Sequence, residues 1–167
     1  MKICVIGLGY IGLPTAAMFA AHGHTVVGVD KNPAVIDALN QGSIIIEEAH
    51  LDTFVKEVVA KGTLRGSLEP EEAEAFIISV PTPITEEKTA DMSYVQAATE
   101  SIVPYLRKGN LVVLESTSPV GTVEELMAPI LERSELRVGE DLYLGHSPER
   151  VIPGQILYEL VHNSRIA

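Results

Sequence analysis

The sequence predicts a single α/β domain built on a doubly wound parallel sheet. Three observations lead to this expectation. Short apolar runs alternate with helical patterns along the 167 residues. The apolar runs are continuous, as in strands that helices cover on both faces. The first run also leads through a glycine-rich turn directly into a helical segment. Sheets of this kind bind ligands just beyond the carboxyl ends of their strands, so function is expected in those loops.

The expected elements alternate in order along the chain. Strands are expected at residues 3–6, 25–29, 64–68, 75–80, 111–115 and 141–145, and helices at 11–22, 33–40, 51–60, 94–106 and 123–131. Asn32 and Pro33 supply a cap and a first helical residue for the second helix. Pro104 is expected to bend or end the fourth helix. The acidic run 69–74 is expected to begin a solvated helix.

A G-x-G-x-x-G segment made by Gly7, Gly9 and Gly12 joins the first strand to the first helix. In such a segment the first glycine permits a tight turn, the second lets the backbone approach a pyrophosphate, and the third lets helix and strand pack closely. The helix N-terminus then points its N–H groups at the phosphates. The pattern predicts a Rossmann-like dinucleotide site, and glycines that serve packing alone are the alternative.

Asp30 follows the second apolar run, 18 residues beyond Gly12. This separation is typical of the carboxylate that accepts hydrogen bonds from an adenosine ribose. A carboxylate there would repel the 2′-phosphate of NADP, so NAD is the expected cofactor. Lys31, directly after the acid, keeps NADP open as an alternative.

Composition excludes several classes of protein. Hydrophobic residues make up 46% of the chain, which argues against disorder. No apolar run approaches the roughly 18 residues of a membrane span, and no signal peptide is visible. One cysteine allows no intramolecular disulfide and suits the cytoplasm. The net charge of −11 argues against binding to nucleic acid or anionic membranes. The five histidines are too scattered to suggest a metal site.

Three proline-containing polar loops follow later strands, at residues 79–83, 115–122 and 146–151. Their prolines favour stiff loops, and the hydroxyls of Thr82 and Thr117 could bind a cofactor or a polar substrate. Ordinary turns are the alternative for each loop. Because the carboxyl ends of parallel strands share one edge of a sheet, the three loops are expected to converge.

The segments GLGYIGLPTA, SVPTP, ESTSPVGT and SPERVIPG, in this order, resemble the NAD-binding half of the UDP-glucose/GDP-mannose dehydrogenase family. They run from residue 3 to about residue 154, nearly the whole chain. The last two segments most resemble the UDP-N-acetyl-D-mannosamine dehydrogenases within that family. Members that act on UDP-glucose tend to carry a glutamate where this chain has Pro153, which favours a UDP-N-acetylhexosamine. UDP-N-acetylglucosamine and UDP-glucose remain alternatives.

The resemblance implies oxidation of a sugar C6 alcohol to a carboxylate in two steps with two NAD. It implies that the NAD diphosphate and ribose contact Gly7, Gly9, Tyr10, Ile11, Gly12 and Asp30. Val80, Thr82 and Thr117 would contact the cofactor farther along, with Thr117 close to the reacting centre. Glu149 would support catalysis near the aldehyde, and Glu149, Arg150 and Val151 would line the UDP-sugar site.

The resemblance also implies parts that this sequence lacks. The family's second oxidation uses a nucleophilic cysteine from a later domain, whereas Cys4 lies inside the first expected strand. The chain is therefore expected to be the N-terminal domain of a longer enzyme, inactive or nearly so alone. Relatives associate through a central helix, so the full-length protein is expected to form a homodimer or a higher oligomer. A free-standing NAD-binding regulatory module and a β-hydroxyacid dehydrogenase are the other interpretations.

Overall fold

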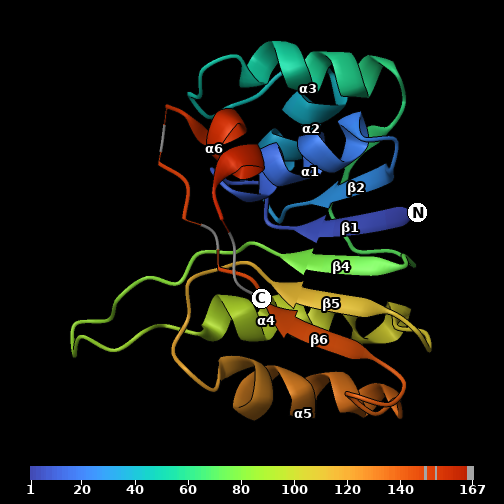
Figure 1. The fold of residues 1–167 in the computed structure, drawn as a ribbon, viewed down its shortest axis with the longest axis vertical. Coiled ribbons are helices and arrows are strands. Elements are labelled where there is room, and N and C mark those ends of the chain that lie inside the picture. The colour runs from blue at the N-terminus through green and yellow to red at the C-terminus, as the bar shows by residue number, and fades with distance from the viewer. Residues whose placement is uncertain (149, 153, 165–167) are drawn as a thin grey trace.

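Six parallel strands form one sheet in the order β3-β2-β1-β4-β5-β6 (Figure 1). The computed structural model describes residues 1–148, 150–152 and 154–164. The strands are β1 (Lys2–Ile6), β2 (Thr25–Val29), β3 (Leu64–Ser67), β4 (Ala75–Ile78), β5 (Leu111–Leu114) and β6 (Tyr143–His146). The strand order reverses between β1 and β4, so the predicted doubly wound sheet is confirmed.

Helices cover both faces of the sheet. One face carries α1 (Gly12–Ala21), α2 (Pro33–Asn40), α3 (Leu51–Ala60) and α6 (Ile156–His162), and the other carries α4 (Ser93–Ile102) and α5 (Ala128–Leu131). Side chains alternate along β1, with Ile3 and Val5 on the first face and Cys4 and Ile6 on the second. Each strand therefore contributes to two cores.

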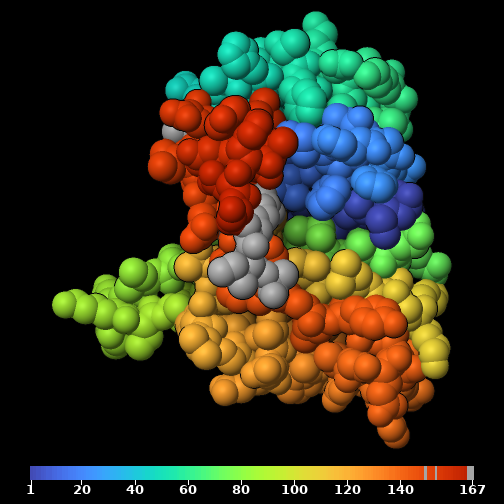
Figure 2. Space-filling model, in the orientation of Figure 1, coloured from blue at the N-terminus to red at the C-terminus, as the bar shows by residue number. Residues whose placement is uncertain are grey.

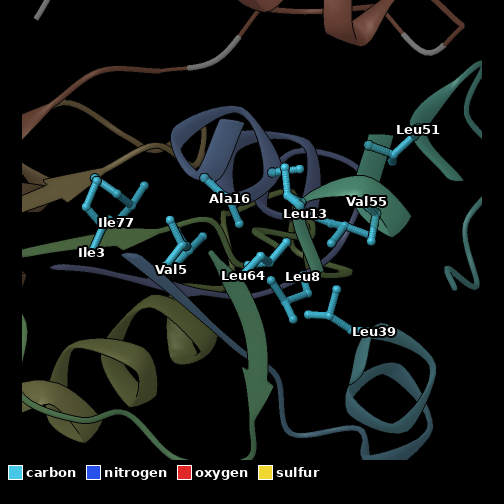
Figure 3. Close-up of a cluster of buried hydrophobic side chains, with 14 of the residues drawn as sticks. Ile3, Val5, Leu8, Leu13, Ala16, Leu39, Leu51, Val55, Leu64 and Ile77 are labelled. Carbon is cyan, nitrogen blue, oxygen red and sulfur yellow. The ribbon is translucent and has the colours of Figure 1, made fainter. Parts of the chain in front are cut away.

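The first core joins β1 to α1 and α3. In Figure 3, Val5 lies in one cluster with Leu13 and Val55, and all three are buried. Each such side chain contributes about 1.5–3 kcal/mol relative to an exposed one. This packing holds the beginning of α1 against the end of β1, where the glycine segment lies.

Proline shapes two helices: Pro104 ends the fourth helix, as expected, whereas the effect of Pro129 was not expected. The helix expected at 94–106 ends at Ile102 and continues as a 3₁₀ turn, Val103–Tyr105, which contains Pro104. The helix expected at 123–131 begins as a π-helix, Thr122–Met127, before α5. Pro129 cannot donate to the carbonyl of Glu125, and its ring crowds that carbonyl, so the turn before it is wider.

The acidic run 69–74 is not the start of a helix, so that expectation is wrong. These residues form an irregular segment that leads into β4. The Glu71 carboxylate accepts a 2.6 Å hydrogen bond from the Lys2 ammonium and also pairs with Arg65, while Glu72 pairs with Arg107. These tertiary ion pairs lie at the amino-terminal edge of the sheet and override the local preference for a helix.

The segment that joins β4 to α4 projects from the body of the domain (Figures 1 and 2). An isolated bridge between Ile84 and Ala90 and a 2.8 Å hydrogen bond between the hydroxyls of Thr85 and Thr89 hold its two sides together. The segment starts at Pro81, beside the carboxyl edge of the sheet. In the described part of the chain, no helix has the length and apolar character that crossing a bilayer requires.

Candidate functional site

A cavity of about 340 Å³ opens where the carboxyl ends of β1, β4 and β5 meet. Its lining consists of residues 7–11, 79–82 and 115–117 together with Asp30. The glycine segment and two of the three polar loops predicted from the sequence therefore come together. The third loop, 146–151, does not contribute to this lining among the described residues, although His146 contacts its edge: its Nε2 lies 3.0 Å from the Ser116 carbonyl.

The three glycines have different surroundings. A Cβ on Gly7 would lie 2.4 Å from the Ser79 carbonyl oxygen, and Gly7 has φ +91°. A Cβ on Gly12 would lie 1.8 Å from the Gly7 carbonyl oxygen. A Cβ on Gly9 would meet nothing within 4 Å. The fold therefore requires glycine at positions 7 and 12, whereas at position 9 the missing side chain only leaves the cavity open.

The N-terminus of α1 is directed by this segment toward the cavity. Residues 9–11 line the cavity directly before α1 begins at Gly12. No side chain caps the helix, and its first turn carries no acidic residue. Ten residues of aligned peptide dipoles and uncapped N–H groups favour an anion at this end. The arrangement can bind phosphate groups without a basic side chain.

Asp30 is held in place at the edge of the cavity. Its Oδ2 accepts a 3.0 Å hydrogen bond from the Leu8 N–H, and its Oδ1 accepts a 2.9 Å bond from the Asn32 N–H. Each carboxylate oxygen can accept a further hydrogen bond. The carboxylate is thus oriented before any ligand binds, as a ribose site requires.

A second cavity of about 290 Å³ adjoins the first, because Gly7, Asp30 and Pro81 line both. Its other walls are largely apolar and come from Ile6, Val29, Lys31, Leu68, Pro70, Tyr94, Ala98 and Ser101. Apart from Lys31, the sequence interpretation missed these residues because they come from separate elements and form no motif. A flat apolar ring fits this cavity better than a charged group does.

Hydrogen bonds fasten the loops after β4 and β5 to each other. The Ser116 hydroxyl accepts from the Val80 N–H at 2.9 Å and lies 2.7 Å from the Val80 carbonyl. The Thr82 hydroxyl donates to the Thr117 carbonyl at 2.7 Å. Thr82 and Thr117 are therefore adjacent, as a shared role at one ligand requires. Ser116, which the sequence interpretation left without a role, thus links the two loops together with Thr82.

Residues 1–167 match the model of the NAD-binding domain of the UDP-glucose/GDP-mannose dehydrogenase family. The chain belongs to this family. It is 50% identical to an NDP-N-acetyl-D-galactosaminuronic acid dehydrogenase from Ralstonia solanacearum over 98% of the chain and 40% of that protein. It is 50% identical to a UDP-N-acetyl-D-mannosamine dehydrogenase from Campylobacter jejuni over 99% of the chain and 42% of that protein.

A solved relative has the same fold. The UDP-N-acetyl-mannosamine dehydrogenase Cap5O from Staphylococcus aureus superposes with a TM-score of 0.95 at 48% identity, over 99% of this chain and 40% of that chain. This chain thus spans about two fifths of the length of these relatives. The predictions of family, fold and NAD as the cofactor are confirmed.

In this NAD-binding domain, the two expected sugar-site residues that the structure describes, Arg150 and Val151, lie apart from both cavities. Arg150 is exposed, and its guanidinium donates to the Ser164 carbonyl at 3.1 Å. Val151 is half-buried, and Glu149 lies outside the described residues. Neither Arg150 nor Val151 lines a cavity that contains the glycine segment. Their expected role in substrate binding stays a prediction.

The segment after residue 150 is anchored to the domain by α6, a helix that the sequence interpretation missed. The Glu48 carboxylate accepts hydrogen bonds from the N–H groups of Gly154 at 2.7 Å and Ile156 at 3.0 Å. Ile156 is fully buried, and Leu157 packs against the first core. The N-terminus of this seven-residue helix thus depends on a side chain about a hundred positions earlier.

Cys4 is unsuited to nucleophilic chemistry. It is fully buried in β1, and burial raises the pKa of its thiol to about 11. The thiolate that attacks a carbonyl is therefore scarce and inaccessible. Among the described residues, no group of three or more His, Cys, Asp or Glu side chains could hold a metal ion.

Proposed function

We propose that this chain is the NAD-binding domain of an enzyme that oxidises the C6 alcohol of UDP-N-acetyl-D-mannosamine to a carboxylate. Family membership supports the reaction class. Two observations support the sugar: the relatives named for UDP-N-acetyl-D-mannosamine, and Pro153 in the last motif. The single structural observation that carries the proposal is the open space at Gly9, beside an uncapped helix N-terminus and an oriented Asp30.

In the proposed complex the dinucleotide crosses the sheet edge from β2 toward β5. Asp30 binds the adenosine ribose, and the adenine ring lies in the apolar cavity beside Leu68 and Tyr94. The diphosphate lies on residues 7–12, with Gly9, Tyr10 and Ile11 against it. The second nucleoside lies near Val80, Thr82 and Thr117.

The second half of the reaction is proposed to need residues outside this chain. Oxidation to the carboxylate takes two hydride transfers to NAD, and the aldehyde stage requires a nucleophile that buried Cys4 cannot supply. We propose that Glu149 supports this chemistry and that Glu149, Arg150 and Val151 form one wall of the UDP-sugar site, completed by further domains. The relatives, which are about two and a half times as long, support this division.

A second substrate has one observation in its favour. The relative from Ralstonia solanacearum, also 50% identical, is named an NDP-N-acetyl-D-galactosaminuronic acid dehydrogenase. A UDP-N-acetylhexosamine of the galacto configuration is therefore the alternative sugar. We also propose that the full-length enzyme is a homo-oligomer and that it works in the cytoplasm, where the free thiol of Cys4 would stay reduced.

Turnover measurements test the proposal. The full-length protein should form NADH with UDP-N-acetyl-D-mannosamine, two NADH for each sugar, and much less with UDP-glucose. The 167-residue chain should bind NAD in calorimetry and should turn over none of these sugars. Preference for UDP-glucose, or turnover by the isolated chain, would contradict the proposal.

A further inference from the structure

Helix α4 forms one wall of the second cavity through three residues on the same face of the helix. Tyr94, Ala98 and Ser101 line the cavity, and their spacing of four and three residues places them in a row along the helix. Tyr94 lies in the first turn of α4, and Ser101 lies in the last turn, about 10 Å farther along the helix axis. The row therefore ends in a hydroxyl group.

The direction of α4 places Ser101 at the inner end of this cavity, away from the carboxyl edge of the sheet. β4 and β5 are parallel, so the chain leaves β4 at the carboxyl edge and returns to the amino-terminal edge before β5 begins. The segment that contains α4 makes this return. Asp30 and Lys31 follow β2 at the carboxyl edge, and Lys31 is exposed. The polar side chains of Asp30, Lys31 and Tyr94 thus start near the carboxyl edge, and that of Ser101 starts farther from it.

The Ser101 hydroxyl is free only to accept a hydrogen bond from a ligand. Its Oγ donates to the carbonyl oxygen of Ala98, one turn earlier in the same helix, at 2.7 Å. A carbonyl oxygen cannot donate, so the single hydroxyl proton is used in this bond, and lone pairs remain on Oγ. A ligand group that donates satisfies Oγ directly. A ligand carbonyl in the same place is bound only if the bond to Ala98 breaks.

We infer that Ser101 makes this cavity select a 6-aminopurine over a 6-oxopurine. The inference rests on the proposed function, in which the ribose lies at Asp30 and the adenine ring lies in this cavity. The 6-amino group is at the edge of adenine farthest from the ribose, so it points away from Asp30 and toward the inner end. Adenine donates from that position, whereas hypoxanthine and guanine carry a carbonyl oxygen there. Ser101 therefore pairs with adenine and is mismatched with the other two bases.

Calorimetry with NAD and nicotinamide hypoxanthine dinucleotide tests the inference on the 167-residue chain. The two dinucleotides differ only at the 6-position of the purine and at the adjacent ring nitrogen. The wild-type chain should bind NAD about three- to tenfold more tightly, the value of one hydrogen bond between uncharged groups. In Ser101→Ala this ratio should fall to about one, because the acceptor is gone while the apolar walls remain.

Thr99→Val is the matched control. The Thr99 hydroxyl also donates to a carbonyl one turn earlier in α4, that of Val95 at 2.7 Å. Thr99 is fully buried, however, and lies outside the lining of both cavities. This variant loses the same kind of hydrogen bond in the same helix, so it measures the effect of helix stability alone. Its ratio of the two dissociation constants should equal that of wild type, even if both affinities fall.

Several results would overturn the inference. Equal or tighter binding of the hypoxanthine dinucleotide by the wild-type chain would do so even if no variant folded. A preference for NAD that persists in Ser101→Ala would assign the selection to another group, whether or not both affinities fall. Absence of NAD binding by the wild-type chain would instead refute the proposed function, and the inference with it.

Discussion

Each position of the G-x-G-x-x-G segment holds glycine for a different physical reason. Gly7 and Gly12 are required by contacts within the protein, whereas a side chain at Gly9 would enter empty space. Sequence reasoning could assign these tasks because the motif's spacing implies them. It could not find Ser79, whose importance comes from its closeness to Gly7, or Ser101, which lines a cavity that no local pattern records.

Substitution at Gly9 should therefore separate binding from folding. Gly9→Val should leave the melting temperature within about 2 °C of wild type and abolish measurable NAD binding, because the side chain occupies the cavity. Gly12→Ala should destabilise the protein, since its Cβ would lie 1.8 Å from a backbone oxygen. Gly145→Val is the matched control: it also meets open space but lies outside both cavities, so NAD binding should persist. Retained NAD binding in Gly9→Val would place the cofactor elsewhere.

Asp30→Ala should weaken NAD binding about 10- to 100-fold, the value of hydrogen bonds of about 1.5–3 kcal/mol to a charged group. It should also reduce the preference for NAD over NADP, because the charge that repels a 2′-phosphate is gone. The Leu8 and Asn32 N–H groups lose their acceptor, so thermal stability should fall as well. Asp30→Asn removes the charge but keeps an acceptor for one of these two N–H groups, so it should lose less stability than Asp30→Ala. Unchanged affinity for both cofactors in calorimetry would remove Asp30 from the site.

The Cys4 thiol should not react with a thiol reagent in the folded protein at pH 8. Its side chain is fully buried, and burial raises its pKa to about 11, so little thiolate forms at that pH. Absorbance of the released chromophore should show one reactive thiol only after denaturant is added. Rapid labelling of the native protein would contradict the structure around β1.

Among the helices and strands, those determined by local sequence patterns could be predicted, and those determined by contacts between distant residues could not. The bounds of β2, α2 and α3 agree with expectation because apolar spacing and the Asn32 cap are local. The π-helix before α5 was not predicted, since Pro129 lies downstream of the turn that it widens. α6 was missed because its N-terminal partner, Glu48, is remote in sequence.

Removing the Glu48 carboxylate should therefore release α6. In Glu48→Ala, hydrogen exchange at the amides of Gly154 and Ile156 should accelerate by about tenfold, because each donor loses its acceptor at a cost of about 1–3 kcal/mol. Glu47→Ala is the neighbouring control, an exposed side chain whose loss should leave this exchange unchanged. Equal exchange in both variants would mean that burial of Ile156 alone holds the helix.

The irregular segment before β4 should make stability depend on pH. The hydrogen bond from Lys2, followed by the contact with Arg65, lowers the pKa of the Glu71 carboxyl group in the folded protein. A lowered pKa adds stability above the unfolded value, and that stability is lost as pH falls through the folded value. The loss should begin below about pH 5 and amount to about 1 kcal/mol or less, because the pair is partly solvated. Glu71→Gln should reduce this part of the pH dependence in thermal melts, and an unchanged profile would contradict it.

For the whole molecule, the strand order accounts for most of what could be predicted about the site. Alternating elements imply a doubly wound sheet, and such a sheet brings the loops after β1, β4 and β5 to one edge. The apolar cavity beside Leu68 and Tyr94 was not predictable, because it depends on the distance between β3 and α4 in the folded chain. Sequence identifies which loops meet, and packing decides the shape of the space between them.

The two edges of the sheet differ in role: one carries ion pairs and the other carries the cavities. Ion pairs among Lys2, Arg65, Glu71, Glu72, Arg107, Lys108 and Asp141 lie where the strands begin, and both cavities lie where the strands end. Substitutions that adapt the domain to heat or acidity can thus accumulate at one edge without altering ligand choice at the other. Such a domain can diverge toward new growth conditions while the edge that binds the dinucleotide stays unchanged.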